Sequence, residues 1–179
     1  MGTMTAGFDE SYVMESRKIC MLGAFATGKT SLVARYVKSI FSEVYQSTIG
    51  VKIDKKNVDL DGRSLSLILW DLAGEDDFVS VQMRYLRGSS GYLLVVDGTR
   101  PDTLETAKML HERVVREVGE LPFVLVLNKA DLTDAWAIGE PSSDFLGLRD
   151  KALATLHTSA KTGDAVNQAF EELARGVLA

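Results

Sequence analysis

The sequence predicts an α/β domain with a mostly parallel, six-stranded sheet, one antiparallel hairpin at the sheet edge, and helices on both faces. Apolar runs of strand length alternate along the chain with segments whose apolar residues recur at helical spacing, which is typical of strand–helix–strand units. Residues 92–96 and 123–127 are unbroken apolar runs, as expected of strands buried on both faces. The dipeptide Asp61-Gly62 between two further segments predicts the hairpin.

The first half of the chain supplies the first three strands. Residues 17–22 form a short, mainly apolar run that predicts the first strand. A glycine-containing loop follows, and apolar residues at helical spacing then predict a helix that ends at about residue 39. Residues 40–50 show no sustained period and are expected to form a loop. The two hairpin strands are predicted at 51–58 and 64–70.

The second half continues the alternation. Pro101 lies near the start of a helix expected to reach about residue 118, where proline fits the first turn. After the strand at 123–127, a loop leads to a helix near 143–152. A last short strand is expected at 153–158 and a last helix at 164–178.

The length of 179 residues corresponds to one domain. Residues 1–15 show no clear period, so we expect a mobile leader there and the domain over residues 16–179. The net charge of −5 argues against nucleic acid as the main partner. The single cysteine, Cys20, is expected to fill the core, which fits a reducing compartment. No segment has the length of a membrane span or the pattern of a lipid anchor, so we expect a cytoplasmic protein without a direct membrane anchor. We also expect a monomer.

Residues 23–30 read GAFATGKT and match the phosphate-binding P-loop pattern G-x-x-x-x-G-K-[ST] without a mismatch. The flanking strand and helix are the context that this pattern requires, because backbone N–H groups and the helix dipole then face a phosphate. Lys29 would reach the β- and γ-phosphates, and the Thr30 hydroxyl would bind Mg²⁺. The predicted phosphate-binding residues of this segment are Gly23, Phe25, Ala26, Thr27, Gly28, Lys29, Thr30 and Ser31.

A second group of polar residues follows an apolar strand at residues 71–74, which read DLAG. Open α/β sheets bind ligands at the carboxyl ends of their strands. Asp71 is therefore expected to hold Mg²⁺, through water, and the Gly74 amide to sense a γ-phosphate.

Several motifs together resemble the Ras superfamily of small GTPases, most closely its Rab-like branch. The matching segments, which span about residues 17–178 in the family's order, are YQSTIG at 45–50, WDLAGED at 70–76, RG at 87–88, NKAD at 128–131 and SAKTG at 159–163. The resemblance implies a P-loop G domain that binds GTP and GDP with Mg²⁺ and hydrolyses GTP.

The base-binding chemistry agrees with this resemblance. A carboxylate only accepts hydrogen bonds, so Asp131 suits the two donors on the guanine edge and has no such pair on adenine. The resemblance further implies that Asn128 steadies the loop, that Lys129 packs on the base, and that Phe41 lies against it. The guanine-binding residues expected in this way are Phe41, Asn128, Lys129, Asp131, Ser159, Ala160 and Lys161.

By the same resemblance, residues 41–50 and 74–86 are the two switches, which contact effector and regulatory proteins. Tyr45 would close over the phosphates, and Thr48 would join Thr30 and Asp71 at Mg²⁺ when a γ-phosphate is present.

Two departures from the family bear on the rate of hydrolysis. The family usually has glutamine at the position of Glu75, where an amide orients the attacking water. It commonly has a small residue at the position of Phe25, whose ring would crowd the γ-phosphate. We therefore expect Lys29, Gly74 and Glu75 to form a catalytic site with a low intrinsic rate. Candidates for an internal arginine that stabilises charge in the transition state are Arg84, Arg87 and Arg100.

Two other functions remain as alternatives. The chain could be a GTP-loaded interaction module with negligible hydrolysis. A P-loop kinase is disfavoured, because the guanine motifs are complete and no arginine-rich lid segment is evident.

Overall fold

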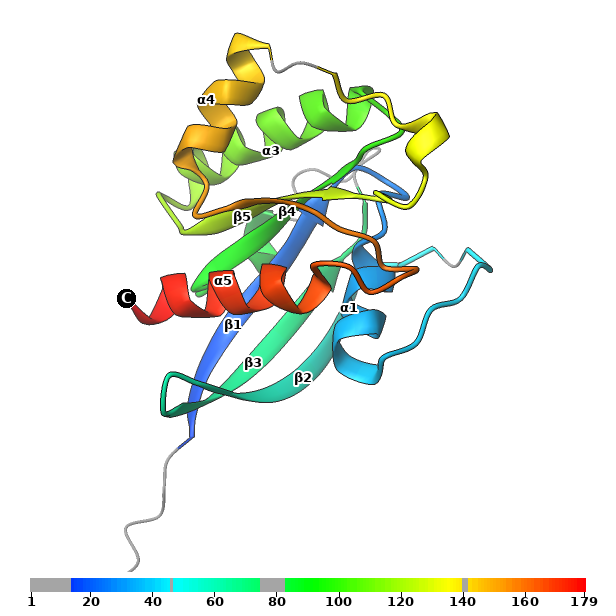
Figure 1. Ribbon diagram of the computed structural model, residues 1–179. Helices are drawn as coiled ribbons and strands as arrows, with labels where there is room; N and C mark the ends of the chain where they lie inside the picture. The colour runs from blue at the N-terminus through cyan, green and yellow to red at the C-terminus, as the bar shows by residue number, and fades with distance from the viewer. Residues whose placement is uncertain (1–13, 46, 75–82, 140–141) are drawn as a thin grey trace, which may run out of the picture.

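The computed structural model describes residues 14–45, 47–74, 83–139 and 142–179, and its six strands form one sheet in the order β2-β3-β1-β4-β5-β6 (Figure 1). The strands are β1 (Glu15–Gly23), β2 (Val51–Leu60), β3 (Arg63–Leu72), β4 (Gly91–Asp97), β5 (Phe123–Asn128) and β6 (Thr155–His157). Only β2 and β3 pair antiparallel among these neighbours. The predicted fold class, with its antiparallel hairpin at the sheet edge, is confirmed.

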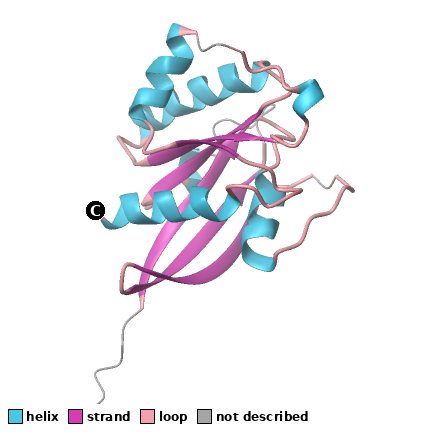
Figure 2. Cartoon of the chain, in the orientation of Figure 1, coloured by secondary structure: helices cyan, strands magenta, loops and turns pink. Residues whose placement is uncertain are grey.

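Helices cover both faces of this sheet (Figures 1 and 2). The described helices are α1 (Lys29–Lys38), α3 (Asp102–Glu117), α4 (Ser143–Lys151), α5 (Val166–Leu178) and a short 3₁₀ turn at Thr133–Ala135. Helices α1 and α5 share one core cluster, in which the rings of Tyr36 and Phe170 stack 4.0 Å apart. Helices α3 and α4 share the other cluster, which contains the stacked rings of Tyr92 and Phe123.

The hairpin turn follows the chemistry of its sequence. Asp61 and Gly62 both have positive φ, at 52° and 79°, and Leu60 pairs with Arg63. Two consecutive residues with positive φ make the two-residue turn whose twist suits a hairpin, and Gly and Asp tolerate that conformation best.

All six strands are confirmed, and their bounds differ from the sequence prediction by up to two residues, most clearly at β1, β3 and β6. β1 begins at Glu15, the last residue of the expected leader, because Glu15 is in register with Leu65 and its carboxylate pairs with Arg63 at 2.7 Å. β3 extends to Leu72, so Asp71 lies within the strand rather than after it. β6 is shorter than expected, at Thr155–His157.

The topology brings the carboxyl ends of β1, β3, β4 and β5 to one edge of the sheet. These strands lie side by side, and all four run parallel. The loops that follow them are therefore neighbours in space, although they are far apart in the sequence. None of the helices that the structure describes is long and apolar enough to cross a membrane.

Candidate functional site

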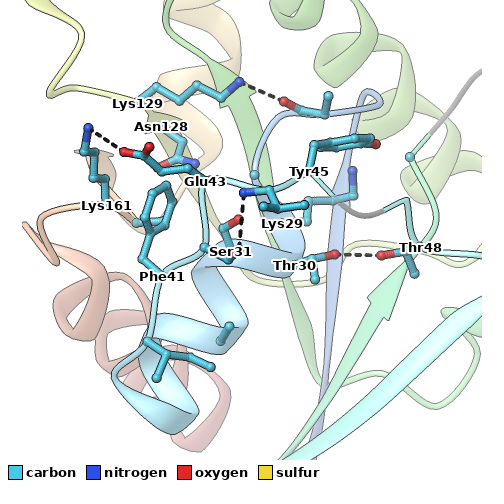
Figure 3. Close-up of a pocket in the computed structure, with 18 of the residues that line it drawn as sticks. Lys29, Thr30, Ser31, Phe41, Glu43, Tyr45, Thr48, Asn128, Lys129 and Lys161 are labelled. Atoms are coloured by element: carbon cyan, nitrogen blue, oxygen red, sulfur yellow. Dashed lines mark hydrogen bonds and ion pairs between the residues drawn. The ribbon is translucent and has the colours of Figure 1, made fainter.

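A cavity of about 560 Å³ opens at this edge of the sheet. Its volume lies in the range of small-molecule and cofactor sites. It is lined by the loop after β1, by the segment after α1, and by the loops after β5 and β6 (Figure 3). The predicted site residues that line it are Phe25, Ala26, Gly28, Lys29, Thr30, Ser31, Phe41, Tyr45, Thr48, Gly74, Asn128, Lys129, Asp131, Ala160 and Lys161.

The P-loop turns sharply from β1 into α1 at one end of the cavity. Gly28 precedes the helix with φ at 98°, and a Cβ there would lie 2.3 Å from the Asn128 amide nitrogen. The Lys29 ammonium is buried and donates to the carbonyls of Gly23 and Ala24 at 3.2 and 2.9 Å. Burial lowers the pKa of Lys29 to about 8, while the nearby Asp71 opposes this shift. The loop thus holds a desolvated cation among backbone groups.

Gly74 lies against the P-loop. A Cβ on Gly74 would lie 2.4 Å from the Phe25 Cα and 3.1 Å from the Lys29 ammonium. Only glycine fits here without moving the P-loop backbone. Gly74 therefore lies beside the lysine that the sequence assigns to the γ-phosphate.

The three predicted metal ligands meet beside the P-loop. Thr30 donates to the Asp71 carboxylate at 2.5 Å, and the hydroxyl oxygens of Thr30 and Thr48 lie 2.7 Å apart (Figure 3). The other carboxylate oxygen of Asp71 is buried and has no hydrogen-bond partner among the described residues. Burial raises the pKa of Asp71, and the hydrogen bond from Thr30 and the charge of Lys29 oppose that shift.

This oxygen-only set fits Mg²⁺, which prefers hard oxygen ligands and keeps several of its waters. No group of three or more His, Cys, Asp or Glu side chains that could hold a metal occurs in the described part of the chain. Two hydroxyls and one carboxylate with a free oxygen therefore form the candidate magnesium site.

Asn128, at the end of β5, joins two loops at the cavity wall. Its side-chain nitrogen donates to the Thr27 carbonyl at 3.0 Å, and its oxygen accepts from the Thr158 hydroxyl at 3.0 Å. Asn128 therefore ties the P-loop to the segment after β6 with both ends of its amide.

Asp131 has one of its carboxylate oxygens fixed by a neighbour. The Ser159 hydroxyl donates to Asp131 at 2.7 Å and is itself fully buried, so Ser159 orients Asp131 instead of lining the cavity. The Lys161 ammonium lies 3.2 Å from Glu43 across the cavity mouth, and Phe41 lies beside this pair (Figure 3). The cavity is thus lined by an oriented carboxylate, Asp131, and by an aromatic ring, Phe41.

Phe25 and Tyr45 meet at the P-loop end of the cavity. Their ring centroids are 5.3 Å apart in an edge-to-face arrangement. Phe25 is 38% exposed and Tyr45 is 56% exposed, so the contact lies at the rim of the cavity. The bulky P-loop residue thus contacts the segment predicted to be the first switch.

Other predicted residues lie outside the cavity wall. Gly23, Thr27 and Asp71 are buried and do not line it. Glu75, like most of the predicted second switch, lies outside the described residues.

Of the three candidate arginines, Arg84 lies against the ring of Tyr85 and Arg87 is exposed. Arg100 donates to the Phe25 carbonyl at 2.6 Å and is the one that contacts the P-loop.

Two polar residues at this edge were missed by the sequence analysis. Asp97 ends the apolar strand β4 and is 1% exposed, and Thr158 follows β6 and holds Asn128. Asp97 has the same signal as Asp71, a carboxylate at the end of an apolar run, and could have been found by it. Thr158 has no such signal, because its role depends on a contact across 30 residues.

Comparisons with known proteins agree with this geometry. The profile described as the Ras family matches residues 18–179. The chain is 37% identical over 164 residues to the Ras-related protein Rab-17 of Mus musculus, covering 90% of this chain and 75% of the relative. It is 34% identical over 165 residues to the Ras-related protein Rab-7b of Mus musculus, covering 90% of this chain and 82% of the relative. It is 32% identical over 165 residues to the Ras-related protein Rab-13 of Bos taurus, covering 90% and 79%.

Proposed function

Because this chain belongs to the Ras family of GTP-binding small GTPases, we propose that it is a Mg²⁺-dependent guanine-nucleotide switch that hydrolyses GTP slowly without a partner. The observation that best supports this proposal is that the P-loop and the predicted guanine-binding carboxylate line the same cavity. The P-loop, with the buried Lys29, lies at one end, and the oriented Asp131 carboxylate lies at the other.

The residues have distinct tasks in this proposal. Asp131 accepts hydrogen bonds from the guanine edge, Phe41 packs against the base, and Asn128 keeps the base loop and the P-loop in register. Lys29 stabilises negative charge on the transferred phosphoryl group, and the Gly74 amide donates to it. Thr30, Thr48 and Asp71 hold Mg²⁺, which supplies charge neutralisation at the β- and γ-phosphate oxygens.

The direct test is the identity of the nucleotide that co-purifies with the protein. We expect GDP or GTP, identified by chromatography after denaturation, and competition binding that strongly favours GTP over ATP. Equal binding of ATP and GTP would contradict the proposal.

The main rival is a GTP-loaded module with negligible hydrolysis. Single-turnover release of phosphate from γ-labelled GTP separates the two, because the rival predicts no release above the uncatalysed background. A P-loop kinase would instead transfer the label to an acceptor, which a screen of small acceptors would detect.

Glu75→Gln is expected to raise the intrinsic single-turnover rate by about tenfold, because an amide can both donate to and accept from the attacking water whereas a carboxylate only accepts. The measurement is phosphate release at constant pH. Since Phe25 lies against Gly74, we expect the double variant with Phe25→Gly to exceed either single variant.

A slower Glu75→Gln variant would instead favour Glu75 as a general base, with an unmodified rate that rises with pH through the carboxylate pKa. An unchanged rate would place Glu75 outside the reaction.

The partner surfaces also belong to this proposal. Residues 41–50 and 74–86 would contact effector and regulatory proteins. The monomeric state of the protein remains a prediction.

A further inference from the structure

Ala26, at the centre of the P-loop, has a left-handed backbone conformation. Its φ is 59°, a value that residues with a Cβ rarely adopt. Such a conformation persists only where surrounding contacts hold it, and it is common where backbone geometry serves a ligand. The contacts that hold Ala26 are therefore candidates for a role in ligand binding.

A cation holds the peptide unit on each side of Ala26. The Arg100 guanidinium donates to the Phe25 carbonyl at 2.6 Å, and the Lys129 ammonium donates to the Ala26 carbonyl at 3.0 Å. Figure 3 shows the extended Lys129 side chain with its ammonium at this contact, which is drawn as a dashed line. Arg100 comes from the segment after β4 and Lys129 from the segment after β5, so the two cations reach the loop from different strands.

Asp97 joins these two cations. One of its carboxylate oxygens lies 3.1 Å from the Arg100 Nε and 2.7 Å from the Lys129 Nζ. The other oxygen accepts from the backbone N–H and the hydroxyl of Thr99, at 2.9 and 2.7 Å. Burial raises the pKa of Asp97, but the hydrogen bonds from Lys129, Thr99 and Arg100 outweigh it, so the pKa lies below its ordinary value. Asp97 is therefore a buried charge that fixes both cations.

The carbonyl directions determine the N–H directions. A trans peptide unit is planar, with its C=O and N–H pointing in opposite directions. Holding the Phe25 and Ala26 carbonyls thus fixes where the N–H groups of Ala26 and Thr27 point. Neither N–H has a hydrogen-bond partner among the described residues, so both remain available to an anion.

We propose that Asp97 and Arg100 are positioning residues that hold the P-loop in its phosphate-binding conformation. Asp97 aligns Arg100 and Lys129 against the two peptide units that flank Ala26. This inference rests on the proposed function, since it concerns the phosphate of the same bound guanine nucleotide. It also implies that a change at Asp97 alters both the position of Lys129 and the conformation of the P-loop.

The test uses the full chain loaded with GDP carrying a fluorescent group on the ribose, and it compares Asp97→Asn with three arginine variants. Arg100→Ala removes the contact with the Phe25 carbonyl. Arg100→Lys keeps the charge but not the fork that spans Asp97 and that carbonyl. Arg113→Ala is the matched control. Arg113 also forms an ion pair, at 2.8 Å to Glu117, but it lies on helix α3 and does not line the cavity.

We expect Arg100→Ala to raise the rate of GDP dissociation about tenfold, as for loss of a hydrogen bond to a charged group. It should also shift the ³¹P resonance of the β-phosphate, a readout that a general loss of stability does not move. Arg100→Lys should recover only part of either effect, and Arg113→Ala should change neither. Asp97→Asn, which keeps the shape but removes the charge, should raise dissociation further because both cations lose their partner.

A second comparison tests the role of Ala26. Glycine adopts positive φ readily, so Ala26→Gly should hold this conformation with less help. The effect of Arg100→Ala on dissociation should then be smaller in the Ala26→Gly background than in the unmodified protein. An equal effect in both backgrounds would contradict the link between Arg100 and the Ala26 conformation.

The outcomes separate this inference from the proposed function. If the unmodified protein binds GDP but Arg100→Ala stays within about twofold of it and the ³¹P resonance does not move, the positioning role is overturned. Full recovery by Arg100→Lys would also overturn it, because charge alone would then suffice. If the unmodified protein binds no guanine nucleotide, the proposed function itself fails.

Discussion

Lys29→Ala is expected to weaken GTP binding by about 100-fold. A desolvated ammonium forms strong hydrogen bonds to phosphate, and alanine leaves the negative charge of the phosphate without this partner. Lys29 is 6% exposed and donates to two P-loop carbonyls, so its ammonium is already out of bulk water. The loss should be larger for GTP than for GDP, since the lysine reaches both the β- and the γ-phosphate.

Calorimetric titration of nucleotide-free protein in excess Mg²⁺ measures this loss. Lys55→Ala is a suitable control, because Lys55 is an exposed lysine on β2 that does not line the cavity. If Lys29→Ala bound GTP as tightly as Lys55→Ala, the P-loop assignment would be wrong.

Asp131→Asn is expected to lower GTP affinity by about two to three powers of ten, since a site built to pair polar groups strongly rejects a ligand that leaves them unpaired. The carboxylate accepts from both guanine donors, whereas asparagine offers one acceptor and a mismatched donor. Xanthine nucleotides present an acceptor where guanine has its amino group, so the variant should prefer them.

Competition between GTP and xanthosine triphosphate measures the change in preference. Asp134→Asn is the matched control, because Asp134 lies three residues further along, in an exposed turn. Ser159→Ala should weaken GTP binding without changing the preferred base, because the serine only orients Asp131. A variant at Asp131 that still preferred GTP would contradict direct recognition of guanine by this carboxylate.

Much of the fold and of the candidate site follows from the sequence alone. The unbroken apolar runs at β4 and β5 indicated strands buried on both faces, and Asp61-Gly62 indicated the hairpin, because both signals come from residues adjacent in the chain. The P-loop pattern could be found for the same reason, because it is a short continuous stretch. The segment at 128–131 is also continuous, and its interpretation came from the resemblance to small GTPases.

Only the tertiary structure decided how these segments meet. It placed Asp97 between Arg100 and Lys129, brought Phe25 against Tyr45, and turned Ser159 toward Asp131. Hydrophobic periodicity records which face of an element is buried, but it carries no information on which strands become neighbours or how far each one extends. Contacts between side chains at the ends of neighbouring parallel strands depend on both, so a buried carboxylate such as Asp97 acquires its partners only when β4 and β5 align.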